Sequence, residues 1–253
     1  MTITATGLSD LGTKRDSNQD SLTWRVSADG QRALGVVADG MGGYEGGEIA
    51  SRITVEALVE TLQELLENSA LEADSLRAHI QQGIDLASRR IDDARKGQEK
   101  LSKMGTTVVL AWLQEDTAWI AHLGDSRAYL FRHGELSQQT RDDTVAQNMV
   151  DDGSIKPEEV PRVPFRNVLT RALGSSTDSA ATITSVKLVP GDHLILCSDG
   201  LTDALSDNQW PAIIGQEKDL ESQARALIDA SLRNQAADNV SLILLQFDQP
   251  RSM

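Results

Sequence analysis

Carboxylates stand at the ends of several apolar runs in this sequence, each beside a glycine or a small polar residue. Asp39 and Gly40 follow one such run, and Asp199 follows another and precedes a second glycine. Asp125 and Asp238 lie in related positions, beside the apolar segments 117–123 and 240–247. A buried strand that ends in Asp-Gly places a carboxylate at the rim of a core, where the glycine lets a backbone carbonyl come close.

Such a set of oxygen ligands suits a hard divalent cation, Mg²⁺ or Mn²⁺. For any one aspartate the simpler interpretation is turn chemistry, because Asp-Gly is a common turn pair. Several converging carboxylates, however, would repel one another and would not all stay ionised without a cation. We therefore predict that the strand-end aspartates, with Asp20 after a polar turn near the N-terminus, meet around metal ions.

The sequence lacks the residues that several other catalytic mechanisms require. A cysteine-based phosphatase needs an arginine six residues after its nucleophile, but Asp203 stands at that distance from Cys197, which we expect in the core. Neither a G-x-x-x-x-G-K-[ST] nucleotide loop nor a G-x-S-x-G serine elbow is present. The four histidines do not group as zinc ligands; they are His79, His122, His133 and His193.

Composition narrows the class of protein further. The 253 residues carry a formal net charge of −14, so we expect no binding to nucleic acid by charge attraction. No apolar run is long enough to span a membrane, and the N-terminus does not resemble a signal peptide, so we expect no membrane insertion. A single cysteine rules out an internal disulfide and fits a cytoplasmic protein.

The elements that position these aspartates are short strands and a few helices. Apolar residues at helical spacing predict one helix over 49–66, a second over 76–91 and a late one over 220–232. Strand patterns, the first typical of an edge strand, are predicted at 4–11, 21–26, 33–38, 105–113, 117–123, 126–131, 180–188, 193–197 and 240–247. The three strands between 105 and 131 follow one another with short turns, which favours an antiparallel meander over a βαβ unit.

These elements predict one α+β domain over 1–253, in which two stacked sheets are flanked by helices. The segment 140–176 is the least regular, with three prolines and two pairs of aspartates. A long insertion of this kind is either a lid or binding loop or a plain surface excursion. We expect a flap here.

Seven short motifs, together and in this order, resemble the metal-dependent protein phosphatases of the type 2C family in their compact bacterial form. They span the chain from about residue 8 to about residue 247. They are Arg15-Asp16-Ser17-Asn18-Gln19-Asp20, Val37-Ala38-Asp39-Gly40-Met41-Gly42-Gly43, Gly105-Thr106-Thr107, Gly124-Asp125-Ser126-Arg127, Leu169-Thr170-Arg171-Ala172-Leu173-Gly174, Ser198-Asp199-Gly200-Leu201 and Asp238-Asn239-Val240-Ser241. The resemblance implies a central sandwich of two antiparallel sheets with helices on both outer faces (α-β-β-α), and it places the flap beside the site.

The resemblance also implies a role for each matching residue. Asp39 is expected to bridge two metal ions, with the carbonyl of Gly40 on one of them and Asp20 in its inner or outer shell. Asp199 and Asp238 are expected to hold the other ion. Asp125, paired with Asp199, matches the position that binds a third, weaker metal in bacterial relatives, and Arg15 is expected to grip the phosphate oxygens.

The implied activity is hydrolysis of phosphoserine and phosphothreonine in proteins, opposing a bacterial Ser/Thr kinase. Two tightly bound Mn²⁺ or Mg²⁺ ions and a third weaker one are expected. Cations make the local potential positive in this acidic chain and activate water, which attacks phosphorus directly without a covalent enzyme intermediate. Arg15 orients the phosphate through a two-pronged contact. Its simpler interpretation is a surface ion pair with Asp16 or Asp20.

The sequence departs from many eukaryotic members at one position. They have a histidine directly after Asp-Gly, thought to protonate the leaving group, and Met41 stands there instead, as in many bacterial members. Methionine cannot donate a proton, so the general acid stays open, with His122 and His133 as titratable candidates. Two other function classes also stay open: a phosphatase-like module that only binds a phosphopeptide, and an acidic cation-binding protein. A non-catalytic relative is expected to lose Asp39, Asp199 or Asp238, and all three are present.

Overall fold

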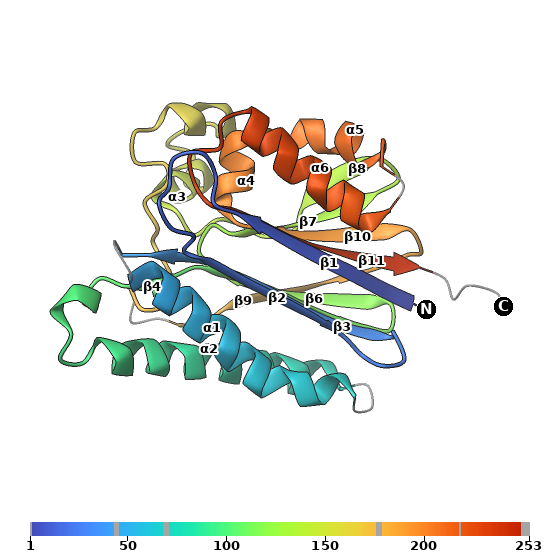
Figure 1. The fold of residues 1–253 in the computed structure, drawn as a ribbon, viewed down its shortest axis with the longest axis horizontal. Helices are drawn as coiled ribbons and strands as arrows, with labels where there is room; N and C mark the ends of the chain where they lie inside the picture. Colours follow the sequence, from blue (N-terminus) through green and yellow to red (C-terminus); the bar gives the residue numbers. More distant parts are fainter. Residues whose placement is uncertain (1, 43–45, 68–70, 176–178, 218, 249–253) are drawn as a thin grey trace.

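Two antiparallel sheets stack face to face in the computed structural model of the chain (Figure 1), which describes residues 2–42, 46–67, 71–175, 179–217 and 219–248. One sheet has the strand order β1-β11-β10-β7-β8, and the other has the order β2-β3-β5-β6-β9, with β4 paired to β3. The strands are β1 Thr2–Asp10, β2 Asp20–Val26, β3 Arg32–Met41, β4 Gly105–Thr106, β5 Val108–Gln114, β6 Thr117–Leu123, β7 Arg127–Arg132, β8 Glu135–Gln138, β9 Thr182–Lys187, β10 Asp192–Cys197 and β11 Val240–Asp248.

Helices cover both outer faces of this sandwich (Figure 1). Helices α1 and α2 pack on the sheet that contains β3, and α4, α5 and α6 pack on the sheet that contains β10. The helices are α1 Gly46–Leu62, α2 Ala73–Arg95, α3 Val145–Asp151, α4 Asp199–Ala204, α5 Trp210–Ile214 and α6 Leu220–Arg233, with short 3₁₀ turns at Gln63–Leu66, Glu99–Leu101, Pro157–Arg162 and Asp207–Gln209. None of the described helices is both long and apolar enough to cross a membrane.

Burial on both faces explains why the central strands read as unbroken apolar runs. Successive side chains of a strand point to opposite faces. Thus Val36 packs under the helices α1 and α2, whereas Val37 packs between the two sheets. Every residue of β5 and β10 is buried. The apolar runs that precede Asp39 and Asp199 are therefore central strands, and each aspartate stands near the end of its strand.

The predicted α-β-β-α sandwich is confirmed, but the predicted meander over 105–131 is wrong. Strands β5 and β6 pair with each other, whereas β7 pairs with β10 in the opposite sheet. The chain crosses between the sheets at 124–126, where Gly124 adopts φ +109° and lies against Thr107. A side chain at position 124 would be strained, so glycine permits this crossing.

Several boundaries also differ from the prediction. Helix α1 ends at Leu62, and the last turn expected of it is the separate 3₁₀ turn. Strand β8 and helices α4 and α5 were not predicted. The expected edge position of the first strand is confirmed, since β1 ends its sheet.

Candidate active site

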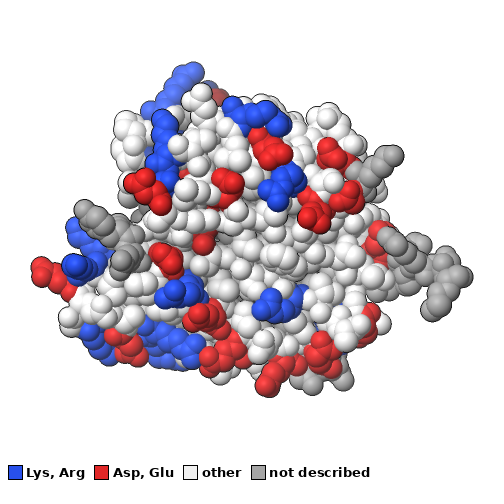
Figure 2. Space-filling view, in the orientation of Figure 1, with Lys and Arg blue, Asp and Glu red and all other residues white. Residues whose placement is uncertain are grey.

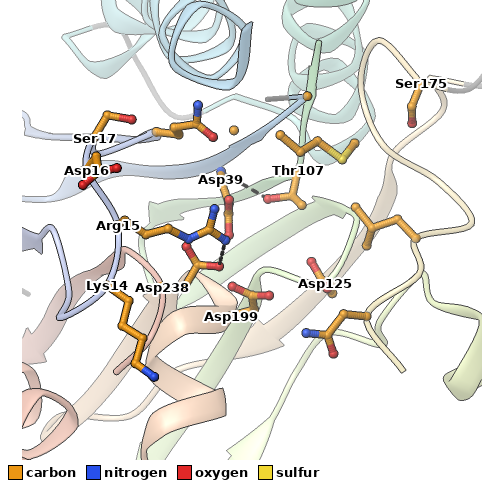
Figure 3. A pocket seen from close by; sticks show the side chains of 16 residues that line it. Lys14, Arg15, Asp16, Ser17, Asp39, Thr107, Asp125, Ser175, Asp199 and Asp238 are labelled. Carbon is orange, nitrogen blue, oxygen red and sulfur yellow. Dashed lines mark hydrogen bonds and ion pairs between the residues drawn. The ribbon is translucent and has the colours of Figure 1, made fainter. Parts of the chain in front are cut away.

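A pocket of about 680 Å³ opens at one end of the sandwich, where strand ends and the β1–β2 loop meet. Four of the five aspartates predicted as metal ligands line it, together with Gly40 and Arg15. Figure 3 shows these aspartates, which come from different elements, turned toward one space. These aspartates are Asp39, Asp125, Asp199 and Asp238. Positions up to 199 residues apart in the sequence thus meet as predicted. Of the quoted motif residues near the pocket, Gly43 lies outside the described residues.

Asp39 is held by its backbone at the end of β3. Its N–H donates to Thr107 Oγ1 (3.2 Å), and its carbonyl accepts from Thr106 Oγ1 (2.8 Å). Gly40 follows where the chain is tightly packed, because a Cβ atom there would lie 2.1 Å from the carbonyl oxygen of Gly47. Glycine is therefore needed after Asp39 because the end of β3 packs closely against the start of α1. A glycine here was expected from the sequence to allow close approach of the backbone.

Asp199 and Asp238 are brought together by the pairing of β10 with β11. The ladder continues past the strand ends, where the N–H of Ser198 donates to the carbonyl of Ser241 (3.0 Å). A Cβ atom on Gly200 would lie 2.0 Å from the carbonyl oxygen of Asn239, so the turn after Asp199 lies directly on the turn after Asp238. Sheet register places these two carboxylates on the same side of the pocket.

Asp20 lies behind the pocket rather than on its wall. Strand pairing sets Asp20 opposite Asp39, and Ser198 Oγ donates to Asp20 Oδ2 (2.8 Å). Asp20 Oδ1 is buried without a hydrogen-bond partner. Burial raises the pKa of Asp20 to about 6, an effect that the hydroxyls of Ser241 and Ser198 partly oppose. Of the two shells predicted for Asp20, this placement fits the outer one.

The fold buries these carboxylates close together, although burial and mutual repulsion disfavour their ionised forms. Burial raises the pKa of Asp39 well above its ordinary value, and the nearby carboxylates, first that of Asp20, raise it further. The pKa of Asp199 is raised in the same way, by burial first and then by Asp125. Burial and the charge of Asp142 raise the pKa of Asp125 to about 7. A positive charge nearby would favour the ionised form of each of these groups.

Arg15 supplies one such charge at the pocket rim. Its Nη2 lies 2.5 Å from Asp238 Oδ2, and the side chains are 52% and 36% exposed. This hydrogen bond to Asp238 is the main reason that the pKa of Arg15 is raised. The ion pairs weighed from the sequence, with Asp16 or Asp20, are therefore not the one formed. Asp238 itself is the partner, which places the guanidinium inside the cluster of carboxylates.

The donor set fits hard cations that keep part of their water. One oxygen of Asp199 is buried without a hydrogen-bond partner, as is one oxygen of Asp20. In the described part of the chain no three His, Cys, Asp or Glu side chains form a closed metal-binding group. Each ion would therefore keep water beside its protein ligands, as Mg²⁺ usually does in proteins.

Comparison with known proteins assigns this site to a family. The family model described as protein phosphatase 2C matches residues 12–240. The chain belongs to the protein phosphatase 2C family. It is 35% identical over 240 residues to the serine/threonine protein phosphatase PstP of Mycobacterium tuberculosis, covering 93% of this chain but 43% of PstP. It is 30% identical over 239 residues to the serine/threonine phosphatase stp of Listeria monocytogenes, covering 94% of both.

The fold of a solved relative agrees. The catalytic domain of PstP, in a structure that contains two manganese ions, superposes with a TM-score of 0.81 at 33% identity and covers 98% of this chain and 99% of that one. The predictions of the type 2C family and of its sandwich fold are thus confirmed, and the predicted enzyme class is that of these relatives.

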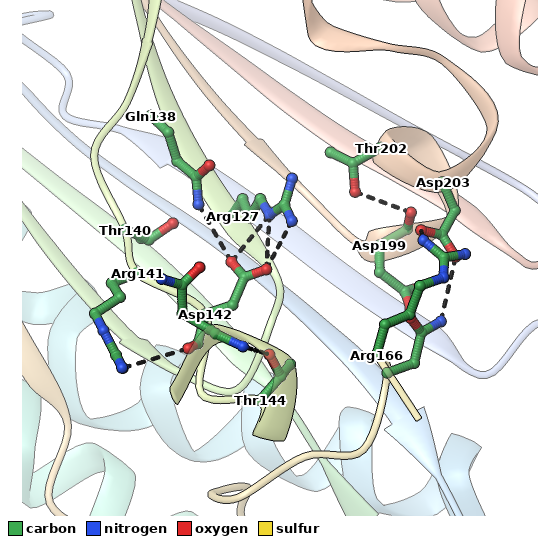
Figure 4. Close-up of polar contacts among 12 residues, drawn as sticks. Arg127, Gln138, Thr140, Arg141, Asp142, Thr144, Arg166, Asp199, Thr202 and Asp203 are labelled. Atoms are coloured by element: carbon green, nitrogen blue, oxygen red, sulfur yellow. Dashed lines mark hydrogen bonds and ion pairs between the residues drawn. The ribbon is translucent and has the colours of Figure 1, made fainter. Parts of the chain in front are cut away.

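The segment predicted as a flap is bonded to the rest of the fold both near its roots and in its outer part. Bonds near the roots join Thr144 to Leu169 in a β-bridge and Arg127 to Asp142 in a bidentate ion pair with a shortest contact of 2.6 Å. Figure 4 shows the outer contact, in which both terminal nitrogens of Arg166 donate to Asp203 of α4 (3.1 and 3.0 Å). Residue 176, the predicted end of the flap, lies outside the described residues, and the segment contains α3 and a 3₁₀ turn that were not predicted.

Neither histidine that could protonate a leaving group faces the phosphatase pocket. His122 Nε2 contacts the carbonyl of Arg141 (2.7 Å), and His133 is exposed in a turn. Neither lines the pocket, whereas Met41 does. Cys197 is fully buried, and burial raises the pKa of its thiol to about 12, as expected for a core residue rather than a nucleophile.

Sequence reasoning missed several residues on the pocket wall. Lys14 and Asp16 flank Arg15 and were not assigned roles, although a basic pair followed by an acid is visible in the sequence. Thr107 belongs to a quoted motif, and its hydroxyl bonds Asp39 and Ser126. Asn167 of the flap also lines the pocket, and no local pattern in the sequence indicates it.

Proposed function

We propose that this chain is a metal-dependent serine/threonine phosphoprotein phosphatase that uses Mn²⁺ or Mg²⁺. The observation that carries the proposal is the meeting of Asp39, Asp199 and Asp238 in one pocket with Arg15 at its rim. The solved relative with two manganese ions supports the same kind of cofactor. Because the chain spans less than half of PstP, the activity proposed here concerns this chain alone.

In this proposal each carboxylate of the pocket is assigned to one or two of the cations. Asp39 and Gly40 line the pocket together with Asp199 and Asp238, and Asp39 would be shared by two tightly bound ions. The carbonyl of Gly40 would complete one side, with Asp20 behind it. Asp125 and Asp199 would hold a third, weaker ion. When bound, such cations polarise the phosphate ester and lower the pKa of water, which direct hydrolysis requires.

Arg15 binds and orients the phosphate in this proposal. A guanidinium has five N–H donors, and the contact with Asp238 uses one nitrogen. The remaining donors would be available to a phosphate in the pocket, where bound cations would make the potential positive despite the net charge of −14. Two donors on adjacent oxygens fix the rotation of the phosphate and align it for attack by water from the opposite side, without a covalent intermediate.

The substrates would be phosphoserine and phosphothreonine in proteins, and the physiological role would be to oppose a bacterial Ser/Thr kinase. The names of the relatives support this class of substrate. The pocket of about 680 Å³ has room for a phosphorylated side chain, and among the residues that the structure describes no aromatic side chain lines it.

The test compares hydrolysis of p-nitrophenyl phosphate and a phosphothreonine peptide with Mn²⁺ and with EDTA, in the wild type and in Asp39→Asn. We expect turnover only in the wild type with metal, and a loss of at least about a hundredfold in the variant, because a shared ligand supports both ions. Turnover that survives both chelation and the substitution would refute the metal mechanism. Tight phosphopeptide binding without turnover in the wild type would instead indicate a binding module.

A further inference from the structure

A second hollow lies beside the pocket along the same strand. A groove of about 380 Å³ runs between β2 and α1, with Arg25 on the strand and Arg52 on the helix. The residues of 17–25 that line the two hollows mostly alternate: Ser17 and Gln19 line the pocket, and Ser21, Thr23 and Arg25 line the groove. Alternate residues of a strand share a face, so Ser21, Thr23 and Arg25 lie on one side of β2, and the pocket residues Ser17 and Gln19 come directly before this strand.

The groove has fixed walls. Ser51 of α1 donates to the carbonyl of Gln19 (2.6 Å), and its hydroxyl bonds that of Ser21 (2.9 Å). These bonds tie the helix to the strand at the end of the groove nearest the pocket. Val55 and Val59 of α1 line the groove and are partly buried, so it offers an apolar surface between two rigid elements.

The charge of the groove is opposite to that of the molecule. The chain has 38 acidic and 24 basic residues, yet neither arginine of the groove pairs with a carboxylate within the described residues. Arg25 donates to Thr23 Oγ1 and the carbonyl of Trp24, and Arg52 is exposed. Glu56 is the one acid on the groove wall. Figure 2 shows that the surface over β1 and β2 is largely uncharged and that acidic and basic side chains lie around it.

We propose that this groove binds an extended acidic segment of the phosphoprotein substrate, next to the phosphorylated residue. The proposal rests on the proposed function. Strand β2 begins at Asp20, beside Asp39, and five residues at about 3.3 Å each place Arg25 about 17 Å along the strand. An extended substrate has the same rise, so an acidic residue about five positions from the phosphorylated residue meets Arg25, and one nearer to it meets Arg52, which follows Ser51 at the pocket end of the groove.

The test uses two phosphothreonine peptides that differ only in having Glu or Gln at positions three and five from the phosphothreonine. Separate pairs carry these residues on the N-terminal and the C-terminal side. The proteins are the wild type, Arg25→Gln/Arg52→Gln, and Arg89→Gln as control, since Arg89 is exposed on α2. Turnover of p-nitrophenyl phosphate with Mn²⁺ tests the catalytic proposal separately.

We expect the double variant to raise KM for one Glu peptide about threefold to tenfold, the effect of two exposed ion pairs, and to leave kcat unchanged. The Gln peptides and p-nitrophenyl phosphate should not distinguish the variants, and high salt should remove the difference. Equal KM values for Glu and Gln peptides in the wild type would overturn the proposal, as would an equal effect of Arg89→Gln. A Glu peptide without phosphate that binds but does not compete with the substrate would assign the groove to another partner and would also overturn it.

If p-nitrophenyl phosphate is not hydrolysed, the proposed function fails, but the groove remains testable. Binding of the fluorescently labelled phosphopeptides then replaces KM. A loss of affinity for the Glu peptide in Arg25→Gln/Arg52→Gln supports the groove, and no loss refutes it.

Discussion

Replacing Asp125 by Asn should make the metal-free protein more stable while it removes activity. The pKa of this carboxyl is raised from 3.8 to about 7, mainly by burial, and the side chain belongs to a residue that is 8% exposed. Each tenfold change in proton affinity is worth about 1.4 kcal/mol, so ionised Asp125 destabilises the fold at pH 8 by up to about 4 kcal/mol. Asparagine removes the charge and keeps the size.

The sign of the pH dependence follows from the same values. Below about pH 4 the carboxyl is protonated in both the folded and the unfolded protein, so there is no penalty. Between about pH 4 and pH 7 the folded protein keeps a proton that the unfolded protein has lost, and the free energy of unfolding falls as the pH rises. Above about pH 7 the penalty is complete. Asp125→Asn should therefore stabilise by about 1–4 kcal/mol at pH 8 and by much less at pH 4.

The assay is urea unfolding in EDTA at both pH values, with Mn²⁺-dependent turnover measured in parallel. Asp116→Asn is the control, since Asp116 pairs with Lys187 and its hydrogen bonds lower its pKa. That variant should lose rather than gain stability and keep its turnover. A metal-free Asp125→Asn protein that is less stable than the wild type at pH 8 would show that ionised Asp125 does not destabilise the fold. Unchanged turnover would show that a third ion is irrelevant.

Two further predictions concern the pocket rim and the flap. Arg15→Ala should raise KM for a phosphopeptide about tenfold or more, with a smaller effect on kcat, because a charge-assisted contact to phosphate is lost. An unchanged KM would mean that Arg15 does not touch the phosphate. Arg166→Gln should increase cleavage of the flap after Glu159 by a glutamate-specific protease severalfold, because the exposed pair with Asp203 holds its outer part, whereas Arg162→Gln should not; equal cleavage in all three proteins would exclude this role.

Strand β7 shows that local sequence patterns do not predict which strands pair. Strand β7 follows β6 after a short turn, and the sequence favours pairing between them. The choice of β10 as partner depends on the positive φ of Gly124 and on the contact of that glycine with Thr107, which is 17 positions earlier in the chain. Helix α4 was missed for a similar reason: six residues do not show a helical period, and packing against α6 and β11 stabilises it.

The sequence by itself determined the central strands and their carboxylate ends, because burial on both faces demands unbroken apolar runs and close backbone contact demands glycine after Asp39 and Asp199. The order of the motifs was enough to identify the family. Only the tertiary structure decided that Asp20 stands behind the pocket and that Arg15 pairs with Asp238, 223 residues away. Those contacts depend on how β1, β10 and β11 align, and register over such separations is fixed by the packing of the whole sandwich rather than by neighbours in the chain.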